Sequence, residues 1–248
     1  MKFGLFEHMD DSGVPLGQQF ENRLSLLEVC DRYGFYAYHL AEHHGTPLGL
    51  APSPGLFLAA VDQRTKRLRF GPLAYSLPLY HPIRLIEEIC MLDQMSGGRF
   101  ELGVGRGVSP FEVGFYGVNP ADGSRQFPEA LRVIKQGLTT DELTFSGEFY
   151  DFKKVPMVLK PVQRPYPPLW YGVLTTDAGL VFTGDTTANV LALRTSDGVT
   201  LWHASIGRLG NSPITYELDG RQFVVVAGGS ALYAFGLPDG AATHPAAR

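Results

Sequence analysis

Residues 82–107 read PIRLIEEICMLDQMSGGRFELGVGRG, and this stretch decides the fold class. Leu85, Ile89 and Leu92 recur at spacings of four and three, which predicts an amphipathic helix. The Ser96-Gly97-Gly98 turn ends that helix, and a short apolar run follows it directly. A helix that leads straight into a buried strand is the repeating unit of a parallel α/β sheet.

The same alternation runs through the chain up to about residue 170. Short apolar runs predict strands, and segments with apolar residues every three or four positions predict helices. The expected elements are strands at 2–6, 35–40, 68–75, 99–104 and 169–173, and helices at 18–33, 54–63, 82–95 and 127–138. Because such alternation requires right-handed crossovers between parallel strands, we predict an α/β fold, an incomplete (β/α)8 barrel of the TIM type.

The pattern changes after Gly172. No lysine follows Lys160, and turn pairs such as Asp197-Gly198 separate short β-prone runs. The expected strands lie at 179–182, 189–193, 200–203, 214–217, 222–226 and 231–235. We therefore expect three parts: a partial barrel over 1–172, an antiparallel β segment that resembles a propeller blade over 173–238, and a disordered tail over 239–248.

Composition excludes several classes of protein. The chain has 248 residues, a net charge of −4 and 44% hydrophobic residues, so it can bury a sizeable core. It holds no Lys/Arg cluster, which argues against a nucleic-acid partner, and no apolar run approaches the ~18 residues of a membrane span. The chain turns polar at Glu7, too early for a secretory signal, and Cys30 and Cys90 lie in helical patterns without metal-ligand spacing. We therefore expect reduced cysteines and a cytoplasmic protein.

In a parallel barrel, functional residues lie at the carboxyl ends of the strands. The predicted ends carry Glu7 and His8, then Glu42, His43 and His44, then Tyr75-Ser76, and then the glycine-rich run 103–107, whereas the opposite ends show no comparable cluster. Adjacent side chains at a strand end point apart and no third ligand follows, so we expect no metal site. One of the two histidines is either a proton-transfer or hydrogen-bonding group in a cleft or a loop residue satisfied by the backbone.

Two further positions have alternative roles. Glu42 either orients a neighbouring histidine or caps the next segment. The run 103–107 allows the backbone to approach a flat or anionic ligand, although it lacks the full pattern of a dinucleotide site. Within that run, Arg106 either meets a phosphate or pairs with a surface carboxylate.

Several motifs stand in a recognisable order. They are AEHHG at 41–45, LDQMSGGRF at 92–100, GVGRG at 103–107 and VQRPYPP at 162–168. Over about residues 1–172 they resemble the bacterial-luciferase-like, flavin-dependent monooxygenases. The resemblance implies a barrel that binds reduced flavin in a water-poor cleft and uses O2 to oxygenate a small organic substrate. It also implies a flavin reductase as partner, and it favours FMN over a deazaflavin.

The resemblance also assigns roles to single residues. His43 matches the histidine that assists proton transfer near the flavin, Glu42 matches its acidic neighbour, and Arg106 matches an arginine near the flavin phosphate. The other cofactor-binding positions are Leu73, Ala74, Tyr75 and Gly105. In the segment that contains Leu73, Ala74 and Tyr75, family members often carry a cis non-proline peptide bond. Gly45 departs from the family's usual aromatic residue, and the similarity ends near Gly172.

The last part of the chain resembles a different family. Residues 179–185, 212–217 and 231–235 are similar to the C-terminal end of pyrroloquinoline-quinone-dependent alcohol dehydrogenases, and Trp202 matches a tryptophan that packs between propeller blades. Because one blade cannot encircle a cofactor, pyrroloquinoline quinone is not expected to bind.

The alternatives to a flavin enzyme are therefore a non-catalytic fusion or truncation product and a fragment of a quinoprotein propeller. The faces left uncovered by missing strands predict a homo-oligomer.

Overall fold

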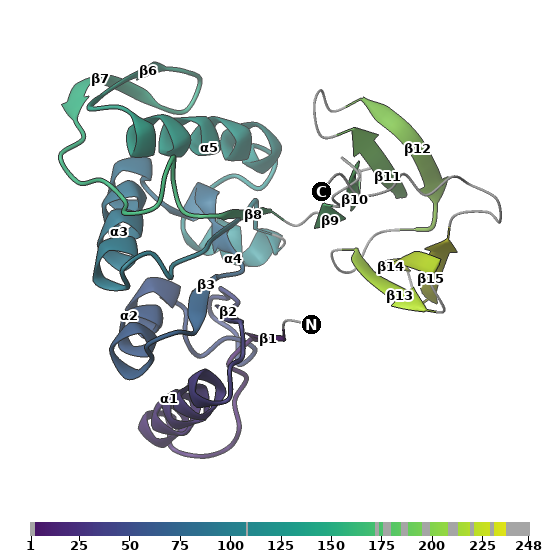
Figure 1. Ribbon diagram of the computed structural model, residues 1–248. Coiled ribbons are helices and arrows are strands. Elements are labelled where there is room, and N and C mark those ends of the chain that lie inside the picture. Colours follow the sequence, from purple (N-terminus) through teal and green to yellow (C-terminus); the bar gives the residue numbers. More distant parts are fainter. Residues whose placement is uncertain are drawn as a thin grey trace, which may run out of the picture. The chain divides into compact units, whose positions relative to one another are not determined.

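The computed structural model describes residues 3–107, 109–171, 174–175, 180–184, 188–194, 199–207, 213–218, 221–228 and 231–236. The chain divides into two compact units, Met1–Tyr171 and Gly172–Arg248 (Figure 1). Each unit has its own sheets and its own hydrophobic core.

The first unit is built on parallel strands. β1 (Gly4–Glu7), β2 (Ala37–Leu40) and β3 (Arg69–Pro72) form one sheet, and β4 (Tyr75–Ser76), β5 (Leu102–Gly105) and β8 (Leu169–Tyr171) form another. A parallel bridge between Phe70 and Phe100 connects β3 to the chain just before β5. The predicted parallel α/β fold is therefore confirmed, and the described residues form a partial barrel whose outermost strands are β1 and β8.

Helices cover one face of these strands (Figure 1). They are α1 (Leu16–Arg32), α2 (Pro54–Arg64), α3 (Pro82–Met95) and α5 (Gly123–Thr139). The short helix α4 (Pro110–Phe115) contacts the loop after β2 instead, and a 3-10 turn spans Leu77–Leu79. The predicted helix at 82–95 has the observed bounds, and its stripe of Leu85, Ile89 and Leu92 is buried. Cys30 and Cys90 are buried free thiols of the same layer, as expected.

The structure differs from the predicted elements at the short helix α4, which was not predicted, and at two further places. The expected strand 68–75 is broken after Pro72, where a cis peptide bond joins Leu73 to Ala74 before β4 begins. An antiparallel hairpin, β6 (Glu142–Ser146) and β7 (Asp151–Pro156), follows α5 and was not predicted. Most side chains of β7 are exposed, so the hairpin lacks the apolar alternation by which a strand is recognised.

A buried polar cluster lies on the face of the strands opposite to the helices. Glu101 accepts hydrogen bonds from Arg69 Nε at 2.5 Å and from Tyr36 Oη at 3.2 Å, and His39 Nε2 lies 3.1 Å from its other oxygen. Burial raises the pKa of Glu101, but the bonds from His39 and Arg69 outweigh burial and hold the pKa below its usual range. Glu101 is therefore a structural carboxylate whose charge is matched by its neighbours.

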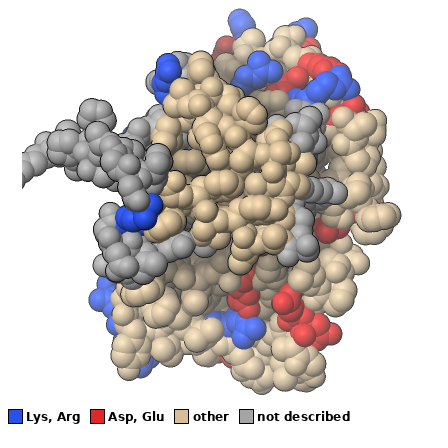
Figure 2. Space-filling model, turned by 90° about the vertical axis from the view of Figure 1, so that its right-hand side faces the viewer, with Lys and Arg blue, Asp and Glu red and all other residues tan. Residues whose placement is uncertain are grey.

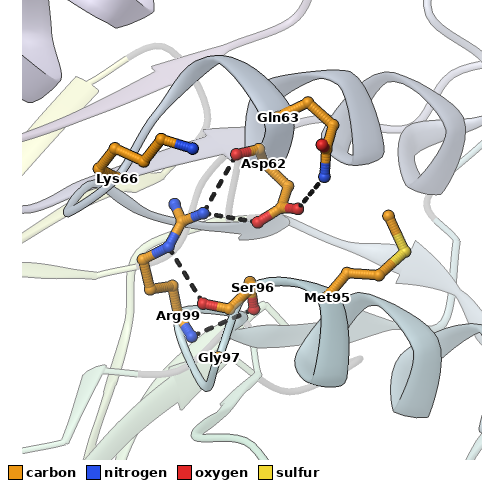
Figure 3. Close-up of a pocket in the computed structure, with 7 residues that line it drawn as sticks. All are labelled: Asp62, Gln63, Lys66, Met95, Ser96, Gly97 and Arg99. Carbon is orange, nitrogen blue, oxygen red and sulfur yellow. Dashed lines mark hydrogen bonds and ion pairs between the residues drawn. The ribbon is translucent and has the colours of Figure 1, made fainter.

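The amino ends of the strands also carry a polar cluster, contrary to our expectation for those ends. A shallow pocket is lined by Asp62, Gln63, Lys66, Met95, Ser96, Gly97 and Arg99 (Figure 3). The Arg99 guanidinium points at the buried Asp62 carboxylate, 2.5 Å away, and also donates to the Leu68 carbonyl at 2.8 Å. These bonds tie the end of α2 and the turn after α3 to the strands, so the pocket is part of the scaffold.

The second unit is antiparallel. Its four-stranded sheet runs in the order β12 (Thr200–Ser205), β11 (Asn189–Arg194), β10 (Leu180–Gly184), β9 (Leu174–Thr175), and its three-stranded sheet in the order β13 (Ile214–Leu218), β14 (Arg221–Gly228), β15 (Ala231–Gly236). Val190, Ile206, Val224 and Val226 form its core. The antiparallel prediction is confirmed, the resemblance to a propeller blade stays a prediction, and the expected tail at 239–248 lies outside the described residues.

Among the described residues of this unit, few charged side chains mark the face that Figure 2 shows. In the view from the right-hand side of Figure 1, residues other than Lys, Arg, Asp and Glu fill most of the central area (Figure 2). Leu201 and Leu232 are exposed apolar residues of its strands. Across the chain, no helix of the described residues is long and apolar enough to cross a membrane.

Candidate functional site

The site lies in the first unit, where the ends of β1, β2 and β5 lie near the short strand β4. The loop after β2 carries Glu42, His43 and His44, and its residues contact β4 and the short helix α4. The structure therefore brings the predicted catalytic pair, Glu42 and His43, to the carboxyl side of the parallel strands, as expected for a barrel.

Glu42 contacts His44 rather than His43. Its carboxylate is buried and accepts the Ser76 N–H at 2.9 Å, while its other oxygen lies 2.7 Å from His44 Nε2. The opposite ring nitrogen of His44, Nδ1, lies 2.8 Å from the Tyr116 hydroxyl. Of the two roles left open for Glu42, the structure supports the orientation of a neighbouring histidine, and that neighbour is His44.

These bonds use every polar atom of the His44 ring. An ionised carboxylate only accepts hydrogen bonds, so His44 Nε2 must carry the hydrogen that faces Glu42. In the neutral ring Nδ1 then has a lone pair, and it accepts from the Tyr116 hydroxyl. His44 therefore has no nitrogen left for a ligand.

His43 is held by a different carboxylate. Its Nδ1 lies 3.3 Å from Glu112 Oε1, and the second oxygen of Glu112 accepts the His44 N–H at 2.8 Å. Glu112 belongs to α4, whose start is capped by Ser109: the Ser109 Oγ accepts the Glu112 N–H at 3.3 Å. Among the described residues, His43 Nε2 has no hydrogen-bond partner.

His8 adds a third imidazole to the site. It follows β1, and its ring stacks on that of His43 with centroids 5.3 Å apart and an angle of 23° between the planes. The Nδ1 atom of His8 is buried and has no hydrogen-bond partner among the described residues. A buried polar atom of this kind requires a partner, and a bound ligand or a water molecule fits that requirement.

The predicted cofactor positions converge at the bend after β3. The cis bond joins Leu73 to Ala74, at the place where the resemblance implies one. A Cβ atom on Gly103 would collide with the Pro72 carbonyl oxygen and would lie 3.2 Å from Leu73 Cα, so only glycine lets β5 run this close to the bend. Gly105 lies beside Ala74, because a Cβ there would be 3.3 Å from the Ala74 Cβ.

Tyr75 contributes its main chain alone to this edge. Its side chain is fully buried and its hydroxyl donates to Glu88 on α3 at 2.7 Å. Burial, followed by the nearby Glu88 carboxylate, raises the pKa of Tyr75 well above its ordinary value. The phenol is therefore a neutral donor inside the helix layer.

Arg106 is exposed and forms no hydrogen bond or ion pair with any described residue. It lies against the first turn of α5, where a Cβ on Gly123 would be 3.5 Å from the Arg106 Cγ. The alternative in which Arg106 pairs with a surface carboxylate is therefore not what the structure shows. The unpaired guanidinium beside a helix amino terminus has the chemistry that an anionic group requires.

Gly45 shows how the chain departs from the usual pattern of the family that it resembles. It has φ = 63°, a region that strongly favours glycine, and a Cβ there would lie 3.0 Å from the Phe115 ring. Phe115 reaches this place from α4, so an aromatic ring lies next to residue 45 although it comes from another segment.

Two site residues were missed by the sequence analysis, Glu112 and Tyr116, whereas His8 stands at a strand end that the sequence predicted. The spacing of Ser109 and Glu112 was a usable signal, because a serine followed three residues later by glutamate is typical of a helix start. No sequence signal linked Glu112 to His43, which lies 69 positions away. No cluster of three or more His, Cys, Asp or Glu side chains that could hold a metal ion occurs in the part of the chain that the structure describes.

Comparisons with known proteins identify the family of the chain. The model of the luciferase-like monooxygenase family matches residues 1–209. The chain belongs to this family. The match extends past Gly172, where we expected the similarity to end, and it includes β9 to β12 of the second unit.

Several relatives of this family are similar to the chain. An uncharacterized protein, y4wF, of Sinorhizobium fredii is 49% identical over 170 residues, which are 68% of this chain and 50% of that protein. The oxygenase component of a flavin-dependent trigonelline monooxygenase of Acinetobacter baylyi is 32% identical over 174 residues, 68% of this chain and 48% of that protein. The crystal structure of the monooxygenase RslO1 from Streptomyces bottropensis superposes with a TM-score of 0.66 at 30% identity and covers 69% of this chain and 53% of that one. The chain thus spans about half the length of the curated relatives it matches.

Proposed function

We propose that this chain is a flavin-dependent monooxygenase that uses reduced flavin and O2 on a small organic substrate, with a separate flavin reductase as the source of reduced flavin. The observation that carries the proposal is His43, whose Nδ1 is engaged by Glu112 while its Nε2 has no partner among the described residues. A histidine held in this way can accept or donate a proton at Nε2.

The other residues of the site support that role. Glu42 and Tyr116 fix the His44 ring, and the ring of His8 shields one face of His43 from water. Bound reduced flavin would supply the electrons for the reduction of O2. The protein's own part is to hold the reactants in place, to exclude water and to move one proton at His43 Nε2.

FMN is the cofactor we propose, in preference to a deazaflavin. A structurally similar oxygenating constituent of 3,6-diketocamphane monooxygenase is in complex with FMN, and a structurally similar tetrahydromethanopterin reductase depends on coenzyme F420. The main chain of Leu73, Ala74 and Tyr75, together with Gly105, would support the flavin ring, and Arg106 would contact its phosphate. The crowded approach of Gly103 to the bend and the unpaired Arg106 both fit this placement.

The test is a titration of the purified chain with FMN, followed by flavin fluorescence. We expect saturable binding that Arg106→Ala weakens by roughly 10- to 100-fold, the equivalent of one hydrogen bond to a charged group. His43→Ala should reduce oxygen transfer more than it reduces FMN affinity. Equal losses of both in the His43 variant would remove the proton-transfer role, and an absence of FMN binding would remove the cofactor assignment.

A second candidate function is a non-catalytic fusion or truncation product that associates through its barrel face. Phe6 and Trp170 favour it, because these large apolar side chains on the outer strands β1 and β8 are 53% and 42% exposed. Such a chain would form a homo-oligomer and bind no flavin. A cytoplasmic location and a propeller-like origin of residues 173–238 accompany both candidates as predictions from the sequence.

A further inference from the structure

The carboxylate of Glu112 faces two different donors at once. One oxygen accepts the main-chain N–H of His44 at 2.8 Å, and the other lies 3.3 Å from His43 Nδ1. The bond to the main chain fixes the position of the carboxylate, so the second oxygen is presented to the His43 ring. Both side chains are mostly buried, with 17% of Glu112 and 14% of His43 exposed.

The chemistry of the carboxylate decides which nitrogen of His43 carries the hydrogen. An ionised carboxylate has acceptors only, so a hydrogen bond between Glu112 and Nδ1 requires the hydrogen on Nδ1. In the neutral ring the lone pair then lies on Nε2. The two adjacent histidines are consequently held in opposite forms, with the hydrogen of His44 on Nε2 and that of His43 on Nδ1.

We propose that Glu112 is a positioning residue that holds neutral His43 in the Nδ1–H tautomer and so reserves Nε2 as the proton acceptor of the site. The catalytic meaning of this assignment rests on the proposed function, in which His43 transfers the proton. The assignment itself is a property of the chain without flavin, and it is measured there.

The sharpest perturbation is Glu112→Gln, which keeps the shape and reverses the hydrogen bonding. The amide oxygen must stay on the His44 N–H, because the amide N–H2 group there would oppose another donor. The N–H2 group then faces His43 Nδ1 and donates to it. The hydrogen of His43 is thereby forced onto Nε2. This nitrogen then has no lone pair with which to accept a proton.

The experiment is nitrogen NMR of the full chain labelled at histidine, without flavin and at a pH where histidines are neutral. Two-bond couplings between ring protons and ring nitrogens distinguish the two tautomers, and loss of a signal set in His43→Gln assigns the residue. In the unmodified chain we expect the Nδ1–H form of His43 to dominate by about tenfold or more, as a hydrogen bond to a charged group provides. In Glu112→Gln we expect the Nε2–H form to dominate, and His44 to keep its Nε2–H form.

Glu87→Gln is the matched control, because Glu87 is an exposed glutamate of α3 with no hydrogen bond or ion pair to any described residue. It should leave both histidines unchanged. A dominant Nε2–H form of His43 in the unmodified chain would overturn the proposal, and so would an unchanged tautomer in Glu112→Gln. These results do not depend on turnover: a chain that oxygenates nothing can still show the Nδ1–H form, and an active chain can lack it.

Discussion

Gly49→Ala is the substitution that tests the packing of His43 most directly. Gly49 is buried, and a Cβ atom added to it would lie 2.6 Å from the His43 Cβ, 3.3 Å from its Cα and 3.4 Å from its main-chain nitrogen. The atoms that it meets belong to the main chain or the root of a side chain, so none of them can rotate away. The loop that carries His43 must move as a whole.

The size of that movement follows from the contact distances. Real Cβ atoms do not approach other heavy atoms closer than 3.0 Å, and 3.4 Å is an ordinary contact, so His43 must shift by about 0.4–0.8 Å. The bond from His43 Nδ1 to Glu112 is already at the long end at 3.3 Å, and such a shift is enough to break it. Overpacking of this kind costs about 1–3 kcal/mol of stability.

The assay is urea unfolding followed by the fluorescence of Trp170, which belongs to the first unit. The chain has two tryptophans, and a Trp202→Phe background leaves Trp170 as the reporter. Gly17→Ala in α1 is the control, since a Cβ there meets nothing within 4 Å, and we expect it to be neutral or to stabilise by up to about 1 kcal/mol. If Gly49→Ala unfolds at the same urea concentration as the parent, the packing argument is refuted.

Three further substitutions probe the buried charges. Glu101→Gln should lower the free energy of unfolding at neutral pH. Because the pKa of Glu101 is depressed in the folded state, its carboxylate stabilises the fold above the unfolded-state pKa of about 4.3. The difference in unfolding free energy between parent and variant should therefore shrink in urea titrations as the pH falls below about 4.3. Arg99→Met leaves the Asp62 carboxylate buried without its cation and should cost about 3–5 kcal/mol by the same assay. Glu42→Gln cannot accept from both Ser76 and His44, and it should cost about 1–3 kcal/mol and weaken the protection of the Ser76 amide in hydrogen exchange.

The sequence predicted the parts of the fold that depend on local apolar spacing. The helix at 82–95 was found with its observed bounds because a single buried stripe, a proline in the first turn and a double glycine at the end all agree. The hairpin β6–β7 was missed because Lys153 and Lys154 stand in a strand whose side chains are mostly exposed. The helix α4 was missed because six residues are too few to show a helical period.

The site was predicted in part of its members and not in its pairings, since Glu112 and Tyr116 were missed. The sequence left Glu42 either to orient a neighbouring histidine or to cap the next segment, without deciding which histidine. Successive residues at a strand end point in different directions, and the structure gives Glu42 to His44 and Glu112 to His43. Contacts of this kind depend on tertiary packing, since Glu112 reaches His43 across 69 positions of the chain.

Two properties of this chain, the arrangement of its histidines and its affinity for FMN, depend on different residues. Every group that holds the histidines lies between His8 and Tyr116, within the first unit and within the region shared with the relatives. The proposed phosphate contact depends on the single exposed Arg106, in a chain about half as long as its curated relatives. Because the histidine arrangement needs no group from outside the first unit, it should persist even where FMN affinity is low. A chain with ordered histidine tautomers and weak FMN binding would therefore retain the proposed proton-transfer group with an incomplete cofactor site.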